Sequence, residues 1–339
     1  MVVLSGGVGG AKLAHGLAML ASVDLSVIVN TGDDLDLHGL RISPDVDTVL
    51  YTLAGLANPE TGWGIRGETW SAHVTLERHG AAGWFRLGDR DLVTHVVRTA
   101  MLARGETPTR VVRRLADDLG VHARILPMSD APVHTRIRTA EGWLEFQEWF
   151  VHRRHADGAL EVRFDGIELA RPSPDVLDAI ASADVVVLAP SNPFVSIGTI
   201  LAVPGMEAAL LAGMAPVVAV SPIVAGAALK GPADRMFETL GGEPSAAGVA
   251  RHYASGHPGL VDALVIDVRD EAQSGSVAAC GIAPFVRQTV MTVDWERRRL
   301  AADLLDVAGM VRPGSPPAPE AAGGSLPTLD PGTPSPRLR

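Results

Sequence analysis

The chain has 339 residues, of which 47% are hydrophobic and 20% charged, and its net charge is −10. This acidic balance argues against a nucleic-acid partner, and the hydrophobic content excludes a globally disordered chain. The single cysteine, Cys280, excludes intrachain disulfides and multi-cysteine metal sites. The length fits one large α/β domain with an insertion, or two domains.

The first predicted element is a β-α-β unit. Met1–Leu4 and Leu25–Val29 are short apolar runs, separated by a helical stretch that begins near Gly10. This spacing predicts two parallel strands joined by a right-handed crossover. The same sequence of buried strand, turn and helix returns at Val185–Ala189 and Val217–Val220. We therefore expect an α/β fold with a mostly parallel sheet and helices on both faces.

A glycine-rich segment joins the first strand to its helix. Its candidate phosphate-binding residues are Gly6, Gly7, Gly9, Gly10 and Lys12. Glycines let the backbone approach an anion, and the N–H groups of a helix N-terminus favour its charge. Neither the dinucleotide-binding fingerprint nor the P-loop pattern is matched, because lysine stands at position 12 and leucine follows it. A tight turn that binds nothing is the alternative, but four glycines in five positions favour phosphate binding.

Carboxylates follow the second strand. Asp33 and Asp34 fall at its carboxyl end, where ligands bind in parallel α/β sheets, and Asp45 and Asp47 follow nearby. Oxygen ligands suit Mg²⁺, which commonly takes one or two carboxylates together with substrate phosphates and water. We expect a magnesium site formed by Asp33, Asp45 and Asp47.

Helix initiation is a competing explanation for one of these residues. Ser43–Val46 reads Ser-Pro-Asp-Val, which matches an N-cap, a proline at the first helical position and an acid in the first turn. The same tetrapeptide opens another predicted helix at Ser173–Val176, with no carboxylate cluster nearby. Helix initiation therefore explains Asp45 about as well as metal binding does. It explains neither Asp47 nor the Asp33–Asp34 pair.

The middle of the chain, about residues 59–165, reads as an α+β insertion or cap. Helical patterns cover Asp91–Arg104 and Arg110–Asp118, and Arg136–Phe150 reads as extended. A loop within it, Gly62–Trp70, carries two tryptophans and an arginine. These can stack on a flat heterocycle, although tryptophans in such loops are more often packing residues.

A third loop follows the predicted strand Val185–Ala189. Small polar residues and glycine at a strand end can hold a nucleotide, and an ordinary turn is an equally good reading. The candidates here are Ser191, Asn192, Ser196 and Gly198. Lys230, one of only two lysines in the chain, follows the next strand and can add a cation at the same edge. Taken alone, Lys230 reads more simply as a surface residue.

No targeting or membrane segment is expected. The uncharged stretch Ala208–Leu229 is interrupted by glycine and proline every few residues, so we read it as a helix end, a strand and a turn. The sequence predicts a cytoplasmic protein. Further strands are expected near Leu264–Val268 and Gly281–Val286. Residues 313–339 hold eight of the 24 prolines, and their composition predicts a disordered tail after an α/β domain of residues 1–312.

Together these motifs resemble the 2-phospho-L-lactate transferase (CofD/FbiA) family of coenzyme F420 biosynthesis. They occur in order over roughly residues 1–310. The segments that carry the resemblance are Ser5–Lys12, Asn30–Asp34, His38–Leu40, Ser43–Thr48, Gly62–Trp70, Leu87–Asp91, Ala189–Gly198 and Ser221–Ile223.

The resemblance implies a Rossmann-like homodimer and a Mg²⁺-dependent transfer. A 2-phospholactyl, phosphoenolpyruvyl or 3-phosphoglyceryl group would move from a GDP-linked donor to the ribityl hydroxyl of the deazaflavin Fo, with release of GMP. Linear motifs do not distinguish these three-carbon acids.

The resemblance also implies roles for particular residues. Asp33 or Asp34 and Arg66 contact Fo, and one aspartate accepts the proton of the attacking hydroxyl. Trp63 is our candidate for a stacking contact with Fo. The donor diphosphate would lie over the two glycine- and serine-containing loops. The alternative is a CofD-like regulator that binds nucleotide sugars without transferase activity and has no need of the Gly62–Trp70 contacts.

Overall fold

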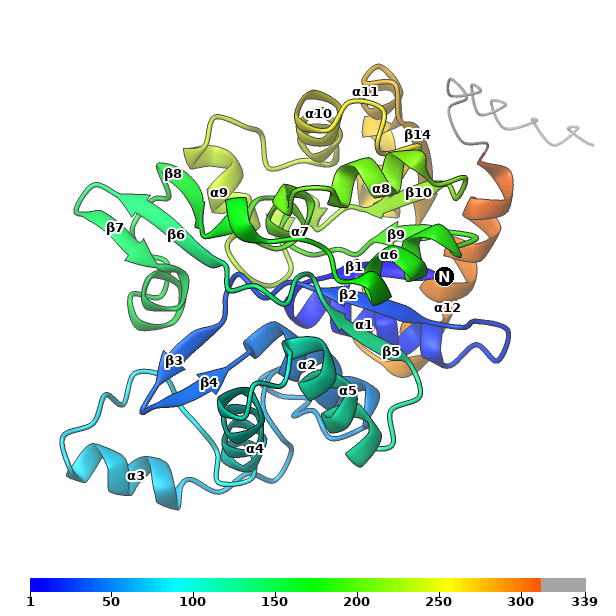
Figure 1. Ribbon diagram of the computed structural model, residues 1–339. Coiled ribbons are helices and arrows are strands. Elements are labelled where there is room, and N and C mark those ends of the chain that lie inside the picture. Colours follow the sequence, from blue (N-terminus) through cyan, green and yellow to red (C-terminus); the bar gives the residue numbers. More distant parts are fainter. Residues whose placement is uncertain (312–339) are drawn as a thin grey trace, which may run out of the picture.

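The computed structural model describes residues 1–311 (Figure 1), so the predicted tail at 313–339 lies outside the described residues. Its centre is a seven-stranded sheet in which every neighbouring pair is parallel. The strands, in sheet order, are β14 (Ala283–Arg287), β13 (Ala263–Asp267), β10 (Val217–Val220), β9 (Val186–Leu188), β1 (Val2–Ser5), β2 (Ser26–Val29) and β5 (Arg124–Pro127).

The central strands are continuously apolar because both faces of the sheet are covered. In β1, Val2 and Leu4 enter one core and Val3 enters the other, as the two-residue period of a strand requires. This architecture confirms the predicted α/β fold with a parallel sheet and helices on both faces.

Two helical layers enclose the sheet (Figure 1). One core is formed with α1 (Gly7–Ala18), α2 (Pro44–Leu53), α5 (Pro108–Asp118) and α12 (Asp294–Met310). The other is formed with α6 (Pro174–Ala181), α7 (Gly198–Ala202), α8 (Met206–Ala212), α9 (Ala233–Thr239), α10 (Ala246–Gly256) and α11 (Ser274–Ala278). The 3₁₀ turns are η2 (Ile167–Leu169) and η4 (Val268–Gln273).

The strand order reverses between β1 and β9. From β1 the chain builds outward through β2 to β5, then returns to β9 on the other side of β1 and builds outward again. In open parallel sheets, the carboxyl ends of the strands at such a switch point form the ligand-binding crevice. The glycine-rich segment after β1 and the serine-containing loop after β9 flank this point.

Two excursions from the sheet surround the same edge. Between β2 and β5 lie the hairpin β3 (Leu35–Leu37) and β4 (Leu40–Ile42), then α2, α3 (Ser71–Arg78), α4 (Asp91–Ala103) and α5. Between β5 and β9 lies a small antiparallel sheet of β6 (His134–Thr139), β7 (Gly142–Glu145) and β8 (Glu161–Asp165), with the π-helical turn η1 (Glu148–His152). The region predicted as an insertion at 59–165 is thus divided by β5, a strand of the main sheet.

Several predicted boundaries shift in the structure. Helix α1 starts at Gly7 rather than near Gly10, so the glycines lie in its first turn instead of in a separate loop. Only part of Arg136–Phe150 is extended, because the chain enters η1 at Glu148. The stretch 208–229 forms the end of α8, then β10 and the short strands β11 (Ile223–Val224) and β12 (Ala227–Ala228).

Within residues 1–311, no single helix is long and apolar enough to cross a membrane. A bent pair, Pro193–Ala202 with Met206–Ala212, reaches that length and composition only when its two parts are taken together.

Candidate active site

A cavity of about 530 Å³ opens at the carboxyl edge of the sheet, beside the switch point. Most of the residues singled out by sequence reasoning line it. These are Gly6, Gly7, Gly9, Lys12, Asp33, Asp45, Asp47, Trp63, Ser191, Asn192, Ser196 and Lys230. Four others, Gly10, Asp34, Arg66 and Gly198, do not line this cavity. Segments far apart in the sequence therefore meet in one place.

Close packing accounts for the glycines at the start of α1. A Cβ atom on Gly6 would collide with Ser196 and come within 3.0 Å of the Asp45 Oδ2 atom, and one on Gly9 would lie 2.5 Å from the Pro190 carbonyl oxygen. A Cβ on Gly10 would collide with Ser5. The N-cap residue, Gly6, has no side chain to cap the helix, and the Gly7 N–H donates to the Asp45 carboxylate. Gly6, Gly7, Val8 and Gly9 border the cavity, so the N-terminus of α1 faces the open space beside Asp45.

Asp45 lies in the first turn of α2 and points toward the glycine-rich turn. Its Oδ2 atom accepts a hydrogen bond from Asn30 Nδ2 at 3.0 Å, and the Gly7 N–H donates to the same carboxylate. Burial raises the pKa of Asp45 to about 6, although these two hydrogen bonds act in the opposite direction. Its carboxylate is therefore charged only at a cost in desolvation.

Asp33 and Asp34 occupy different environments. Asp33 lines the cavity, and its buried Oδ1 atom makes no hydrogen bond to residues 1–311. Burial and the nearby Asp45 carboxylate raise the pKa of Asp33 well above its usual value. The side chains of Thr135 and Asn30 favour the charged form and lower this pKa, but by less. Asp34 does not line the cavity and accepts a hydrogen bond from the Ser43 hydroxyl at 2.7 Å, while its own buried Oδ1 atom also makes no hydrogen bond to residues 1–311. Burial raises the pKa of Asp34 to about 7.

Asp47 is held by an ion pair with Arg98. Arg98 of α4 donates to both carboxylate oxygens of Asp47, with Nη1 3.0 Å from Oδ2. Both side chains are almost fully buried, at 2% and 5% exposed. The charge of Asp47 is thus already compensated by the protein. Of the acidic residues predicted as metal ligands, Asp47 is the one that the structure pairs with an arginine.

The carboxylates fit a magnesium ion only in part. No group of three or more histidine, cysteine, aspartate or glutamate side chains in residues 1–311 is arranged to hold a metal. Asp45 lies close enough to Asp33 to raise the pKa of Asp33, and Asp33 has an unpartnered buried oxygen. Two carboxylates suffice for Mg²⁺ when substrate phosphates and water supply the other ligands. The donor set therefore fits with Asp33 and Asp45, but not with Asp47.

The loop after β9 is tied to the glycine-rich turn. The Ser191 hydroxyl bonds to the backbone of Gly6, with both the N–H and the carbonyl oxygen 3.1 Å away. Asn192 Oδ1 accepts from the backbone N–H groups of Phe194 and Val195, so it caps the π-helical turn η3 (Pro193–Ile197). Gly198 starts α7 and packs on the Pro193 carbonyl oxygen. Asn192 and Gly198 thus have structural roles that the sequence left open.

Both lysines of the chain border the cavity. Lys12 Nζ donates to the Met291 carbonyl oxygen at 2.9 Å, and Lys230 Nζ donates to the Thr61 carbonyl oxygen at 2.7 Å. Burial and the positive charges of Arg297 and Lys230 lower the pKa of Lys12. Each ammonium keeps donors beyond this one bond, so both can meet an anion in the cavity.

Aromatic residues form another part of the cavity wall. Trp63, which is 43% exposed, borders it together with Trp84, Phe85, Phe146 and Phe150. Arg66 donates instead to the Gly55 carbonyl oxygen at 2.5 Å, outside the cavity lining. Sequence reasoning missed four of these aromatics, because they come from segments whose approach depends on the tertiary fold. It also missed Asn30, although a polar residue directly after a buried strand is a usable signal.

Comparisons with known proteins show which family the chain belongs to. Residues 1–305 match the family model described as 2-phospho-L-lactate transferase CofD. The chain is 43% identical to a phosphoenolpyruvate transferase of Kitasatospora aureofaciens, covering 93% of this chain and 99% of that protein. It is 44% identical to the protein of the same name from Streptomyces griseus, with 92% and 99% covered.

Solved structures support the fold. The chain is similar to a UPF0052 family member from Bacillus halodurans, with a TM-score of 0.62, 16% identity, and 90% and 97% of the two chains covered. A second structure from the same organism gives a TM-score of 0.63 at 18% identity, with 90% and 98% covered. The family match and the close relatives extend over nearly the whole chain, and the protein therefore belongs to the 2-phospho-L-lactate transferase CofD family, as a transferase of phosphorylated organic-acid groups.

Proposed function

We propose that this protein transfers a phosphoenolpyruvyl group from a GDP-linked donor to the ribityl hydroxyl of the deazaflavin Fo, in coenzyme F420 biosynthesis. GMP leaves, and Mg²⁺ assists. Relatives from Kitasatospora, Streptomyces and Mycobacterium species, 39–44% identical, are named phosphoenolpyruvate transferase, which favours this acid over lactate and glycerate.

The observation that carries the proposal is the composition of the cavity wall. One part consists of the glycine-rich N-terminus of α1 with Lys12 and Lys230, which suits a diphosphate. Another part is aromatic and suits a flat heterocycle. Asp33 and Asp45 border the same space. A donor with a diphosphate and an acceptor with a ring system are the two substrates that this lining favours.

The chemistry assigned to the chain's own residues is positioning, charge neutralisation and proton transfer. The ribityl oxygen forms a bond to the phosphorus that carries the acid, and the bond from that phosphorus to the GMP oxygen breaks. Asp33 accepts the hydroxyl proton, because burial raises the pKa of Asp33 and so increases its affinity for a proton. The first N–H groups of α1 and the two lysines offset charge on the diphosphate oxygens.

Asp45, together with one oxygen of Asp33, would hold Mg²⁺, and the other Asp33 oxygen stays available for the proton. A bound magnesium ion supplies Lewis-acid stabilisation of the transferred phosphoryl oxygens. Asp47 is left out of this ligand set, because Arg98 already neutralises it. Homodimer formation, which rests on the family resemblance, and a cytoplasmic location, which rests on the sequence, complete the proposal.

The test is an assay with purified protein, Fo, Mg²⁺ and the GDP-linked enolpyruvyl donor, following GMP by chromatography. We expect GMP to form only when Fo and Mg²⁺ are both present. A CofD-like regulator, the alternative function, would bind nucleotide without releasing GMP. Binding of a nucleotide sugar with no GMP release in the complete mixture would therefore contradict the proposal and support that alternative.

A further inference from the structure

The pair formed by Asp47 and Arg98 joins two helices beside the cavity. Asp47 lies in α2 and Arg98 in α4, and the carboxylate and guanidinium meet through two hydrogen bonds. Burial alone would lower the pKa of Arg98, but the charge and hydrogen bonds of Asp47 raise it. A buried pair of this kind is often no more stabilising than apolar residues of the same size. Its presence next to the candidate site therefore suggests a role other than stability.

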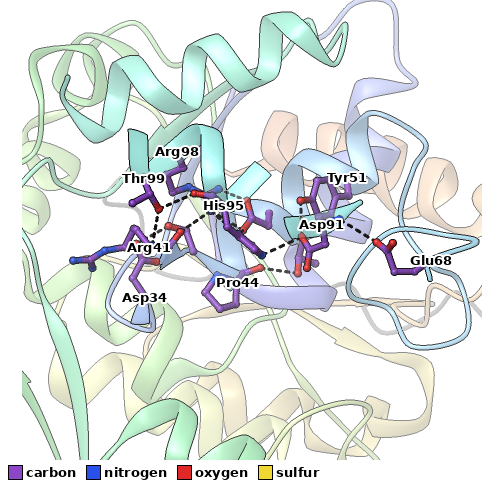
Figure 2. Close-up of polar contacts among 12 residues, drawn as sticks. Asp34, Arg41, Pro44, Tyr51, Glu68, Asp91, His95, Arg98 and Thr99 are labelled. Carbon is purple, nitrogen blue, oxygen red and sulfur yellow. Dashed lines mark hydrogen bonds and ion pairs between the residues drawn. The ribbon is translucent and has the colours of Figure 1, made fainter. Parts of the chain in front are cut away.

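The pair is supported from α4 (Figure 2). Arg98 Nη1 lies 3.2 Å from His95 Nδ1, and because arginine only donates, this nitrogen accepts. The proton of a neutral His95 then lies on Nε2, which is 3.3 Å from Asp91 Oδ1. The Tyr51 hydroxyl donates to the same Asp91 oxygen at 2.7 Å. Tyr51 belongs to α2, so the chain of contacts returns to the helix from which it started.

These contacts hold a helix start that lacks its own cap. Ser43 precedes α2, but its hydroxyl is bonded to Asp34 and no side chain caps the first turn. That turn carries Asp45. Asp45 bonds to Asn30 and Gly7, and Val46 is buried in the core. Asp47, two residues beyond Asp45, ties the same turn to α4 through Arg98.

We propose that Arg98 is a positioning residue for the transfer reaction. By holding Asp47, it fixes the first turn of α2 so that the Asp45 carboxylate faces Asn30 and the glycine-rich turn. Arg98 does not line the cavity, so it acts through its neighbours: it holds Asp47, lies beside His95 and donates to the Arg41 carbonyl oxygen at 3.5 Å. The role of Asp45 in transfer rests on the proposed function, whereas the effect of Arg98 on the α2 turn does not.

The test compares Arg98→Gln, Arg98→Lys and the double variant Asp47→Asn/Arg98→Gln. The matched control removes an exposed ion pair in α5, Arg114→Gln/Asp118→Asn. Three quantities are measured: the thermal midpoint, hydrogen exchange of segment 43–48 by mass spectrometry, and kcat for GMP release. Arg98→Gln leaves Asp47 unpaired and lowers the midpoint. The double variant removes both charges and recovers most of that loss.

For a positioning role, recovery of stability does not bring recovery of activity. In the double variant we expect exchange of segment 43–48 to be about tenfold faster than in the wild type, and kcat to be about 100-fold lower, as for a misplaced catalytic group. Arg98→Lys keeps the charge without the two-pronged contact, and kcat should fall between those of the wild type and the double variant. The control should match the wild type in exchange and kcat.

Two results would overturn the proposal. One is a double variant with wild-type kcat, and the other is wild-type exchange across 43–48. Either would show that the pair contributes packing alone. Faster exchange in the double variant, combined with no GMP release by the wild-type protein, would contradict the proposed function while supporting the positioning of α2 by Arg98.

Discussion

The chain contains the tetrapeptide Ser-Pro-Asp-Val twice, and the polar residues of the two copies have different roles. At Ser173–Val176, the serine caps α6 by accepting from the Val176 N–H, and Asp175 forms a surface ion pair with Arg113 at 2.8 Å. At Ser43–Val46, the proline again starts a helix, but Ser43 bonds to Asp34 and Asp45 turns into the cavity. The tetrapeptide specifies where a helix begins. Its surroundings decide whether its polar groups serve the helix or the site.

The largest expected difference is between Asp45→Asn and Asp175→Asn. Asp45→Asn should abolish Mg²⁺-dependent transfer, a loss of at least about 100-fold in kcat, because it removes a carboxylate that would hold Mg²⁺. Asp175→Asn removes an exposed ion pair worth at most about 1 kcal/mol and should leave kcat unchanged. Steady-state assays of GMP release, with circular dichroism to check folding, measure both. Near wild-type turnover in Asp45→Asn would contradict the assignment of Asp45 as a Mg²⁺ ligand.

A smaller difference is expected between Asp33→Asn and Asp34→Asn. Loss of a general base costs about 10²–10⁴-fold, so Asp33→Asn should lower kcat by at least about 100-fold. Asp34 does not line the cavity and acts through its bond to Ser43, so its replacement should cost about tenfold or less. The two kcat values are compared at saturating donor and Fo. The reverse order would assign the proton transfer to Asp34.

The two serines should separate stability from activity. Ser173→Ala removes a working N-cap and should lower the free energy of unfolding by about 1 kcal/mol without changing kcat. Ser43→Ala removes a bond to a buried carboxyl group, which raises the pKa of Asp34 further and should lower kcat. Urea unfolding and the transfer assay distinguish them. If Ser43→Ala loses stability but keeps full activity, Ser43 serves α2 in the same way that Ser173 serves α6.

The smallest effect on activity is expected from His252, which lies on the face of the sheet covered by α6 and changes only the stability at low pH. His252 of α10 packs against Phe194 and Phe237, and burial, with the charge of His257, lowers its pKa to about 4. As the pH falls from 6.5 to 4, the unfolded chain binds this proton before the folded chain does, so the contribution of His252 to stability is lost across that window. Urea unfolding at several pH values should show a shallower decline in His252→Gln. An identical decline in the wild type and the variant would show that His252 does not contribute to the loss of stability at low pH.

The sequence predicted the strands and the sheet edge well, because continuously apolar runs such as Val217–Val220 have few alternative folds. It also predicted that Asp33 and Asp45 lie close together, and both line the cavity. It was wrong in assigning a capping role to Ser43, since a linear motif does not show that Asp34 competes for the hydroxyl.

Arg98 and Asn30 illustrate a second limit. Arg98 is one of 27 arginines and lies 51 positions from its partner Asp47, and the packing of α4 against β4 and α5 brings the two together. Lys12 and Lys230 are the opposite case. Their rarity in an arginine-rich chain drew attention to them, and both border the cavity.

A competition among the three GDP-linked donors shows directly which acid the protein transfers. The protein is incubated with Fo, Mg²⁺ and equal amounts of the GDP-linked lactyl, enolpyruvyl and glyceryl donors, and the deazaflavin products are resolved by mass spectrometry. We predict a product carrying the phosphoenolpyruvyl group in excess over the other two. A dominant phospholactyl or phosphoglyceryl product would contradict the assignment, and unmodified Fo in every reaction would contradict the transfer itself.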